Sequence, residues 1–266
     1  MFLHVFIADL FADPVICKPN ITFSPKVEPQ MSEEVDTRVS LSLHPLNVEK
    51  VDGYDETTAV YLGQVQTAFS EAYLGLGQVH TARDKARTNP TWNEAQQLIQ
   101  TQDYADKVFA RVARQMDSAK GNLDRSIAAL DTQLTGPITT KAAQSVSAEI
   151  RSFAKGLATS ERLSFMQRAI AGGDETTITA LLGAPSYLSG IDVKTQEVFT
   201  RLWHERNSPE IAQRVRAMKG ARDLIMDRGG LLHGQFEKAV GAAPHKVAAL
   251  RAAKNEAEQA FVLKQA

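Results

Sequence analysis

Six histidines and one cysteine are the side chains with which this chain could most readily bind a metal or act as nucleophile and base. No two of these histidines have the spacing of metal ligands, and the motifs H-E-x-x-H, C-x-x-C, G-x-x-x-x-G-K-[ST] and G-x-S-x-G do not occur. We therefore expect no enzyme activity, no metal and no cofactor. A helical enzyme whose site is assembled from distant residues would lack such motifs too, and it stays open as an alternative. The histidines are His4, His44, His80, His204, His233 and His245.

Basic residues form the clearest charge pattern. The whole chain carries 30 basic and 31 acidic residues, but residues 201–266 carry 12 basic and seven acidic ones. This pattern fits a surface for nucleic acid or for an acidic partner. It also fits a solvated helix face with internal ion pairs, such as one from Lys219 to Asp223. Few aromatic residues interleave with the cations, so a stacking platform for single strands is not indicated. The candidate interaction surface consists of Arg214, Arg216, Lys219, Arg222 and Arg228.

Two long helices are predicted upstream of these residues. Apolar residues recur at steps of three and four over 55–87, which is one helical face, and Asn89 and Pro90 end it. A second helix is predicted over 92–134, with Thr91 as N-cap and Glu94 as its capping-box partner. Because only a short turn separates the two helices, we expect an antiparallel hairpin. Its heptad seam contains Phe109, Met116, Leu123 and Leu130, and also Leu98, Ala105, Val112 and Ala119.

Shorter helices are predicted after the hairpin. Pro137 is suited to open a helix whose apolar stripe runs from Ile138 through Val146, Ile150 and Phe153 to Leu157. Another helix starts at Ser208 and Pro209 and ends at Gly229 and Gly230. A short helix with Leu232, Phe236 and Val240 follows, and Pro244 opens a last one. The only strand candidate is "TRVSLSL" at 37–43. The predicted fold class is all-α: a long antiparallel helical hairpin followed by a compact bundle of shorter helices.

The stretch "RAIAGGDETTITALLGAPSYLSGI", residues 168–191, predicts a small helical hairpin. Gly172 and Gly173 end one helix, and Asp174 caps the next. The pattern is that of one ankyrin-type unit, but no second copy occurs, and a single unit cannot bury its own face. We therefore expect a local hairpin whose following loop tucks Tyr187, Leu188 and Ile191 under the bundle.

These residues also carry a resemblance to known proteins. The stretch 168–191, together with the alanine- and glutamine-rich helices, looks similar to uncharacterised helical proteins from tailed-phage and prophage gene clusters. The resemblance includes no diagnostic motif, so no functional residue is carried over. It implies a component of the virion.

The first 30 residues differ from the rest in composition. They hold four of the ten prolines, four of the 11 phenylalanines and Cys17. Asp9 and Asp13 interrupt the apolar run and no basic residue precedes it, so a signal peptide is not indicated. Either Met31 is the true start, or residues 1–30 are an extended arm that docks on a partner. The predicted organisation is an arm (1–53), a hairpin (54–135) and a helical bundle (136–266).

A long amphipathic hairpin is typical of assembly proteins. We predict a structural or interaction protein acting in macromolecular assembly, with protein partners or self-association, located in the cytoplasm or in a virion. No apolar run approaches the roughly 20 residues of a membrane helix, so no membrane partner is expected. The alternative is a nucleic-acid-binding regulator that uses the basic C-terminal third. The two differ in whether the basic residues of 214–228 form a continuous exposed stripe.

Overall fold

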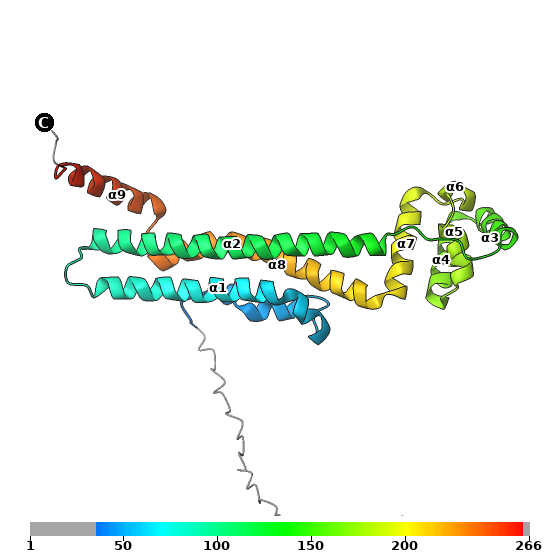
Figure 1. Ribbon diagram of the computed structural model, residues 1–266, viewed down its shortest axis with the longest axis horizontal. Coiled ribbons are helices and arrows are strands. Elements are labelled where there is room, and N and C mark those ends of the chain that lie inside the picture. Colours follow the sequence, from blue (N-terminus) through cyan, green and yellow to red (C-terminus); the bar gives the residue numbers. More distant parts are fainter. Residues whose placement is uncertain (1–35, 263–266) are drawn as a thin grey trace, which may run out of the picture. The chain divides into compact units, whose positions relative to one another are not determined.

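The computed structural model describes residues 36–262, and every regular element among them is a helix, which confirms the all-α prediction (Figure 1). The expected strand at 37–43 is instead a turn followed by the first short 3₁₀ helix. The predictions for Cys17, for residues 1–30 and for Met31 lie outside the described residues. The elements are η1 (Leu41–Leu43), η2 (Pro45–Lys50), α1 (Glu56–Arg87), α2 (Glu94–Leu134), α3 (Gln144–Gly156), α4 (Thr159–Gly172), α5 (Glu175–Leu182), α6 (Ser186–Ser189), α7 (Val193–Asn207), α8 (Pro209–Val240) and α9 (Pro244–Gln259).

Three long helices, α1, α2 and α8, form a bundle around one core. The predicted hairpin of α1 and α2 is present, and α8 packs against both helices. Gly75 permits the close approach of α1 and α2, because a Cβ atom there would lie 2.7 Å from Cγ1 of Val108. The fully buried core side chains include Leu62, Val65, Phe69, Leu76, Val79 and Val112.

The buried face of α2 follows an 11-residue rather than a seven-residue repeat. Its buried positions advance by steps of three, four and four, the spacing that keeps one face of a nearly straight helix toward its neighbours. Phe109 and Leu130, which we placed on the heptad seam, are only partly buried, whereas Val108 and Ile127 are buried. The other buried positions in this run are Ala105, Val112, Met116, Ala119 and Leu123.

Helix α8 continues through Gly229 and Gly230, where we expected it to end. The separate helix expected around Leu232 and Phe236 is therefore the last part of α8. Each glycine costs a helix interior about 1 kcal/mol relative to alanine, but tertiary packing supplies most of a helix's stability. The buried side chains of Ile225, Leu232 and Phe236 provide that packing on both sides of the glycines. The core of the bundle thus extends across the expected boundary between 54–135 and 136–266.

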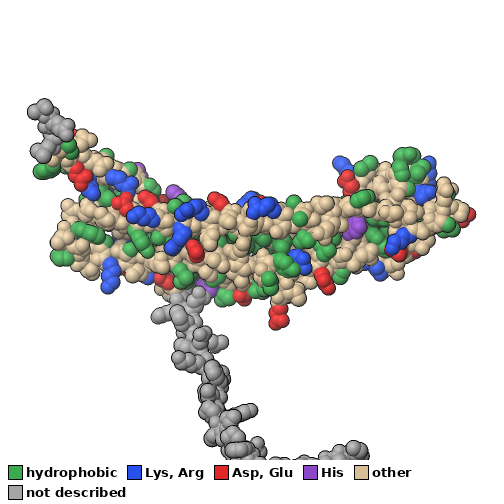
Figure 2. Space-filling model, in the orientation of Figure 1, with side chains coloured by type: hydrophobic (Ala, Val, Ile, Leu, Met, Phe, Trp, Pro, Cys, Tyr) green, Lys and Arg blue, Asp and Glu red, His purple; other side chains and the backbone are tan. Residues whose placement is uncertain are grey.

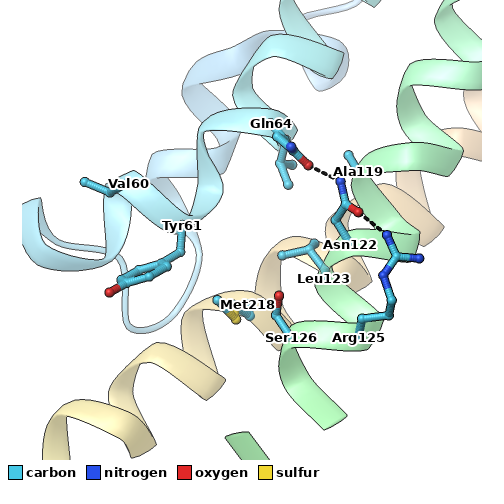
Figure 3. Close-up of a pocket in the computed structure, with 10 residues that line it drawn as sticks. Val60, Tyr61, Gln64, Ala119, Asn122, Leu123, Arg125, Ser126 and Met218 are labelled. Atoms are coloured by element: carbon cyan, nitrogen blue, oxygen red, sulfur yellow. Dashed lines mark hydrogen bonds between the residues drawn. The ribbon is translucent and has the colours of Figure 1, made fainter. Parts of the chain in front are cut away.

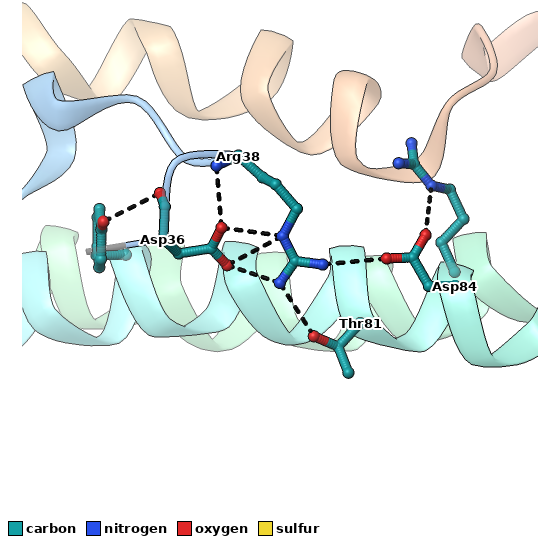
Figure 4. A network of polar contacts seen from close by, with 6 residues as sticks. Asp36, Arg38, Thr81 and Asp84 are labelled. Carbon is teal, nitrogen blue, oxygen red and sulfur yellow. Dashed lines mark hydrogen bonds and ion pairs between the residues drawn. The ribbon is translucent and has the colours of Figure 1, made fainter. Parts of the chain in front are cut away.

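Residues 36–53 also belong to the bundle, although we assigned them to an arm. Val39, Leu43 and Val48 are buried in the same core as α1. Arg38 pairs with Asp36 at 2.8 Å and with Asp84 of α1 at 3.1 Å (Figure 4). The hydrogen bond from Arg38 is the main reason why the pKa of Asp36 is lowered to about 2.

Two predicted helix starts are wrong. The N-cap of α2 is Asn93, whose Oδ1 accepts from the amide of Gln96 at 2.8 Å, whereas Thr91 donates to the side chain of Asn89. Helix α3 begins at Gln144, so Pro137 and Ile138 lie in an irregular segment before it. Thr91 and Pro137 are residue types that commonly start helices, but each lies a few residues before the observed start.

The helices α3 to α7 form a second core, which we call the short-helix cluster. Arg201 of α7 joins it to the bundle through an ion pair with Asp131 of α2, which also pairs with Lys219 inside the bundle. Asp131 lies 3.1 Å from Arg201 of α7 and 2.9 Å from Lys219 of α8. The buried side chains of this core are Ala154, Met166, Ala169, Ile170, Ile178, Leu181, Leu182, Ile191, Phe199 and Trp203.

Candidate protein-interaction surface

Helix α3 exposes part of the apolar stripe that its sequence predicted. Phe153 is 58% exposed and Val146 is 42% exposed, while Ile150 and Leu157 are half-buried. The buried side chains of α3 are Ser147 and Ala154. They lie about a quarter turn around the helix from the exposed side chains of Val146 and Phe153. Because the two buried side chains are small, α3 can lie close to α5 and α6, and this packing leaves the bulky stripe on the outside.

A groove of about 420 Å³ lies beside this stripe, between α3 and α4. The ring of Phe153 packs edge-to-face against that of Phe165 from α4, with 5.4 Å between centroids. Leu157, Ser160 and Ser164 complete the lining, and Glu161 and Arg168 lie at the rim. We call this feature the α3–α4 groove.

The charged residues around the groove differ in whether they already have a partner. One carboxylate oxygen of Glu161 accepts from the amide of Ala158 at 3.2 Å, so it caps the start of α4. Arg168 and Lys155 are exposed, and neither has an ion-pair partner within residues 36–262. Of these two, only Arg168 lines the groove, which therefore offers one cation to a bound partner beside its aromatic rings.

Arg162 holds the walls of the groove together. Its guanidinium donates to the carbonyls of Ala154 and Leu157, both at 2.7 Å, and also to that of Gly190. It thereby adds side-chain hydrogen bonds at the end of α3, where backbone carbonyls lack the partners they have in a helix interior. Sequence reasoning missed this residue, because nothing in the local pattern distinguishes an arginine on a wet helix face from one that joins three segments.

The stretch that follows α5 is partly as predicted. Gly173 has a φ of 71°, and Asp174 accepts from the amide of Thr177 at 3.0 Å, so the predicted glycine stop and cap are confirmed. Ile191 is buried, but Tyr187 is 69% exposed and Leu188 is 41% exposed, contrary to expectation. Figure 2 shows hydrophobic side chains on the surface over α6. The remaining exposed large apolar residues of the short-helix cluster are Val193, Val198 and Leu202.

The five basic residues of the predicted interaction surface do not form one stripe. At about 100° per residue their positions are distributed around the whole circumference of α8. The structure places Arg214 over the ring of Tyr61, at 4.1 Å, and pairs Lys219 with Asp131 instead of the expected Asp223. Of the other three, Arg222 pairs with Asp223, Arg216 is exposed and Arg228 is half-buried. The arrangement lacks the continuous stripe on which the nucleic-acid alternative depends.

Another hollow, of about 400 Å³, lies in the bundle between α1, α2 and α8 (Figure 3). Its polar side chains already bond to one another: Asn122 donates to Gln64, and Arg125 donates to Asn122. A wider hollow beside Pro137 and Pro185 is partly spanned by Gln196, which donates to two backbone carbonyls. In both hollows, polar side chains of the lining are therefore already engaged within the chain.

Histidines and acidic residues do not gather into a metal site within the described part of the chain. His204 is half-buried, and its Nε2 lies 2.9 Å from the carbonyl oxygen of Gly136. Burial is the main cause of a lowered pKa at His80. In residues 36–262, no helix has the length and apolar character needed to cross a membrane.

No protein-family model, no curated protein and no solved structure matches this chain.

Proposed function

We propose that this chain is a structural or interaction protein acting in macromolecular assembly, and that the α3–α4 groove is its protein-binding surface. The observation that carries the proposal is the exposed apolar stripe of α3, with Phe153 at its centre. A contiguous apolar patch with a polar rim on a folded protein marks a site of interaction. Aromatic anchors surrounded by polar groups are also the usual anatomy of a protein–protein hot spot.

The preformed shape of the groove supports the same proposal. Phe165 fixes the ring of Phe153 from one side, and Arg162 ties the end of α3 to α4. A surface held in its binding geometry loses little conformational entropy when a partner docks. The resemblance of residues 168–191 to proteins of phage gene clusters favours a virion as the assembly concerned.

Site-specific photo-crosslinking tests the proposal. p-Benzoylphenylalanine is placed in the full chain instead of Phe153, and in a control instead of Asp117, an exposed residue on α2. Irradiation of expressing cells, followed by mass spectrometry, should give defined protein adducts from position 153 and none from position 117. Equal labelling at both positions, or no adduct at 153, would overturn the proposal. An adduct counts only if Arg168→Glu reduces its yield, because a specific partner must sense the rim.

A further inference from the structure

The segment at the end of α9 exposes two large apolar side chains. Phe261 is 88% exposed and Val262 is 68% exposed, and Val247 is the only buried side chain that α9 contributes among the described residues. Hydrophobic side chains are visible at this end of the molecule in Figure 2. The helix is held to α2 by an ion pair between Arg251 and Asp103. Nothing in residues 36–262 covers Phe261 and Val262.

The chemistry of this segment complements that of the α3–α4 groove. The amide of Phe261 donates to the carbonyl of Glu258 at 3.1 Å, so the helical path continues past the end of α9. Residues three and four apart share a helix face, so Glu258 lies on the side of Phe261 and Val262. The pairing of Glu258 with Lys254 is loose, at 3.7 Å and exposed, and is easily exchanged. The segment thus offers two apolar side chains beside a carboxylate, and the groove offers aromatic rings beside Arg168.

The segment cannot reach the groove of its own chain. Arg251 is fixed at Asp103, whereas the short-helix cluster meets α2 at Asp131. The 28 residues between these two points of α2 span roughly 42 Å at 1.5 Å per residue. The 11 residues from Arg251 to Val262 span at most about 38 Å even when fully extended, and about 16 Å as a helix. Figure 1 shows α9 and α3 beside opposite ends of α2.

We propose that residues 256–262 of a second copy occupy the α3–α4 groove. This inference rests on the proposed function, because it names the partner of the same groove. The contact joins two different surfaces, so it is heterologous and head-to-tail. Such contacts close into rings or grow into open chains, depending on the rotation between subunits.

Complementation between two variants tests this head-to-tail arrangement. Phe153→Asp spoils the groove and leaves the segment intact, whereas Phe261→Asp spoils the segment and leaves the groove intact. Both residues are exposed, so both variants should keep the wild-type circular dichroism spectrum and melting temperature. In sedimentation velocity the wild type should associate increasingly with concentration, and each variant alone should associate at least tenfold more weakly. An equimolar mixture should form a one-to-one dimer that does not grow, because only one functional contact remains.

Charge reversal provides a second measurement that does not depend on the aromatic residues. Arg168→Glu and Glu258→Arg should each weaken association, and mixing the two should restore it partly. Met226→Asp is the matched control: Met226 is an exposed apolar residue of α8, 59% exposed, outside both surfaces. It should leave association unchanged.

The outcomes separate this inference from the proposed function. A wild type that stays monomeric, together with crosslinking from position 153 to a different protein, overturns the self-docking inference and supports the proposed function. Association that Phe153→Asp weakens but Phe261→Asp does not, or a mixture that fails to complement, also overturns the inference while the groove remains an interface. A monomeric wild type without any adduct at position 153 overturns both.

Discussion

The helices α2 and α3 are both amphipathic, but they place their apolar stripes in opposite environments. In α2, Val112, Met116 and Leu123 are buried between α1 and α8. In α3, Ser147 and Ala154 are buried, and Phe153 lies at the surface. Periodicity therefore predicts that a helix has an apolar face, but it does not predict whether the same chain covers that face. The uncovered stripe of α3 is the basis of the proposed interaction surface.

Helix length explains part of this difference. The bundle combines helices of 32, 41 and 32 residues, so each stripe has two long neighbours. The helices of the short-helix cluster have 4 to 15 residues, and their core is correspondingly smaller. Within this cluster, α3 packs through the small residues Ser147 and Ala154, and its larger side chain Phe153 is left on the outside.

The largest expected effect is on the bundle core. Phe69 is completely buried in α1, so Phe69→Ala should lower the free energy of unfolding by roughly 3–5 kcal/mol through lost transfer energy and a new cavity. Urea denaturation followed by circular dichroism measures this change. A loss of only about 0.5 kcal/mol, as for a surface substitution, would mean that Phe69 does not lie in a well-packed core.

Two glycines sharpen the description of how the long helices pack. Gly75→Ala should cost about 1–3 kcal/mol, because its new Cβ would lie 2.7 Å from the side chain of Val108. Gly230→Ala has open space around it within α8 and should instead stabilise the protein by about 0.5–1 kcal/mol. Thermal melts of both variants measure these changes in stability. A stabilising effect of both substitutions would contradict the close approach of α1 and α2.

The junction between the two regions should be sensitive to pH. Burial opposes ionisation of Asp131, but the hydrogen bond and charge of Lys219 and the charge of Arg201 outweigh it, so its pKa is lowered from 3.8. A carboxyl whose folded-state pKa is depressed stabilises the fold above its unfolded-state pKa and loses this contribution as pH falls through the folded value. Asp131→Asn should therefore cost about 1 kcal/mol at neutral pH, and the difference should vanish in acid.

Urea denaturation of wild type and Asp131→Asn between neutral pH and pH below 3.8 measures this dependence. Asp227→Asn is the matched control, because Asp227 is exposed on α8 and has no ion-pair partner in the described part of the chain. A difference between Asp131→Asn and wild type that persists unchanged in acid would show that packing, rather than charge, joins the two regions.

The smallest expected effect is at the surface of α3. Phe153→Ala should change the free energy of unfolding by roughly 0.5 kcal/mol or less, because Phe153 is exposed in the isolated chain. The same denaturation measurement as for Phe69→Ala makes the comparison direct. A loss of several kcal/mol in the free energy of unfolding would mean that Phe153 is part of a core. The groove would then not be a free binding surface.

The sequence predicted local structure better than long-range packing. The extent of α1, the end of α2, the stop at Gly173 and the cap at Asp174 follow from periodicity and local hydrogen bonds, and they are observed. The return of α8 to the hairpin was not predicted, because no pattern within α8 specifies which helices lie beside it. Gly229 and Gly230 were misread for the same reason: their local cost is visible in the sequence, and the packing that compensates for it is not.

The candidate site could be predicted even less. The stripe of α3 was recognised, but the side of α3 that packs against the core was not, since Ser147 and Ala154 are weak signals in an apolar pattern. The basic residues of α8 were recognised as a cluster along the chain, yet Arg214 and Lys219 contact Tyr61 and Asp131, which are far away in sequence. Contacts of this kind depend on topology, which periodicity does not encode.

The late return of α8 has a consequence for the kinetics of folding. Arg83 donates to the carbonyl of Lys238 at 3.1 Å, across a separation of 155 residues. The hairpin of α1 and α2 needs only a short turn, so it can form early, whereas α8 can dock only after a long loop has closed. Until then the apolar face of the hairpin is open to other chains, which is the condition that favours misassembly. We expect stopped-flow refolding to show a fast phase of helix formation followed by a slower phase, and the slower phase alone should respond to substitutions in α8.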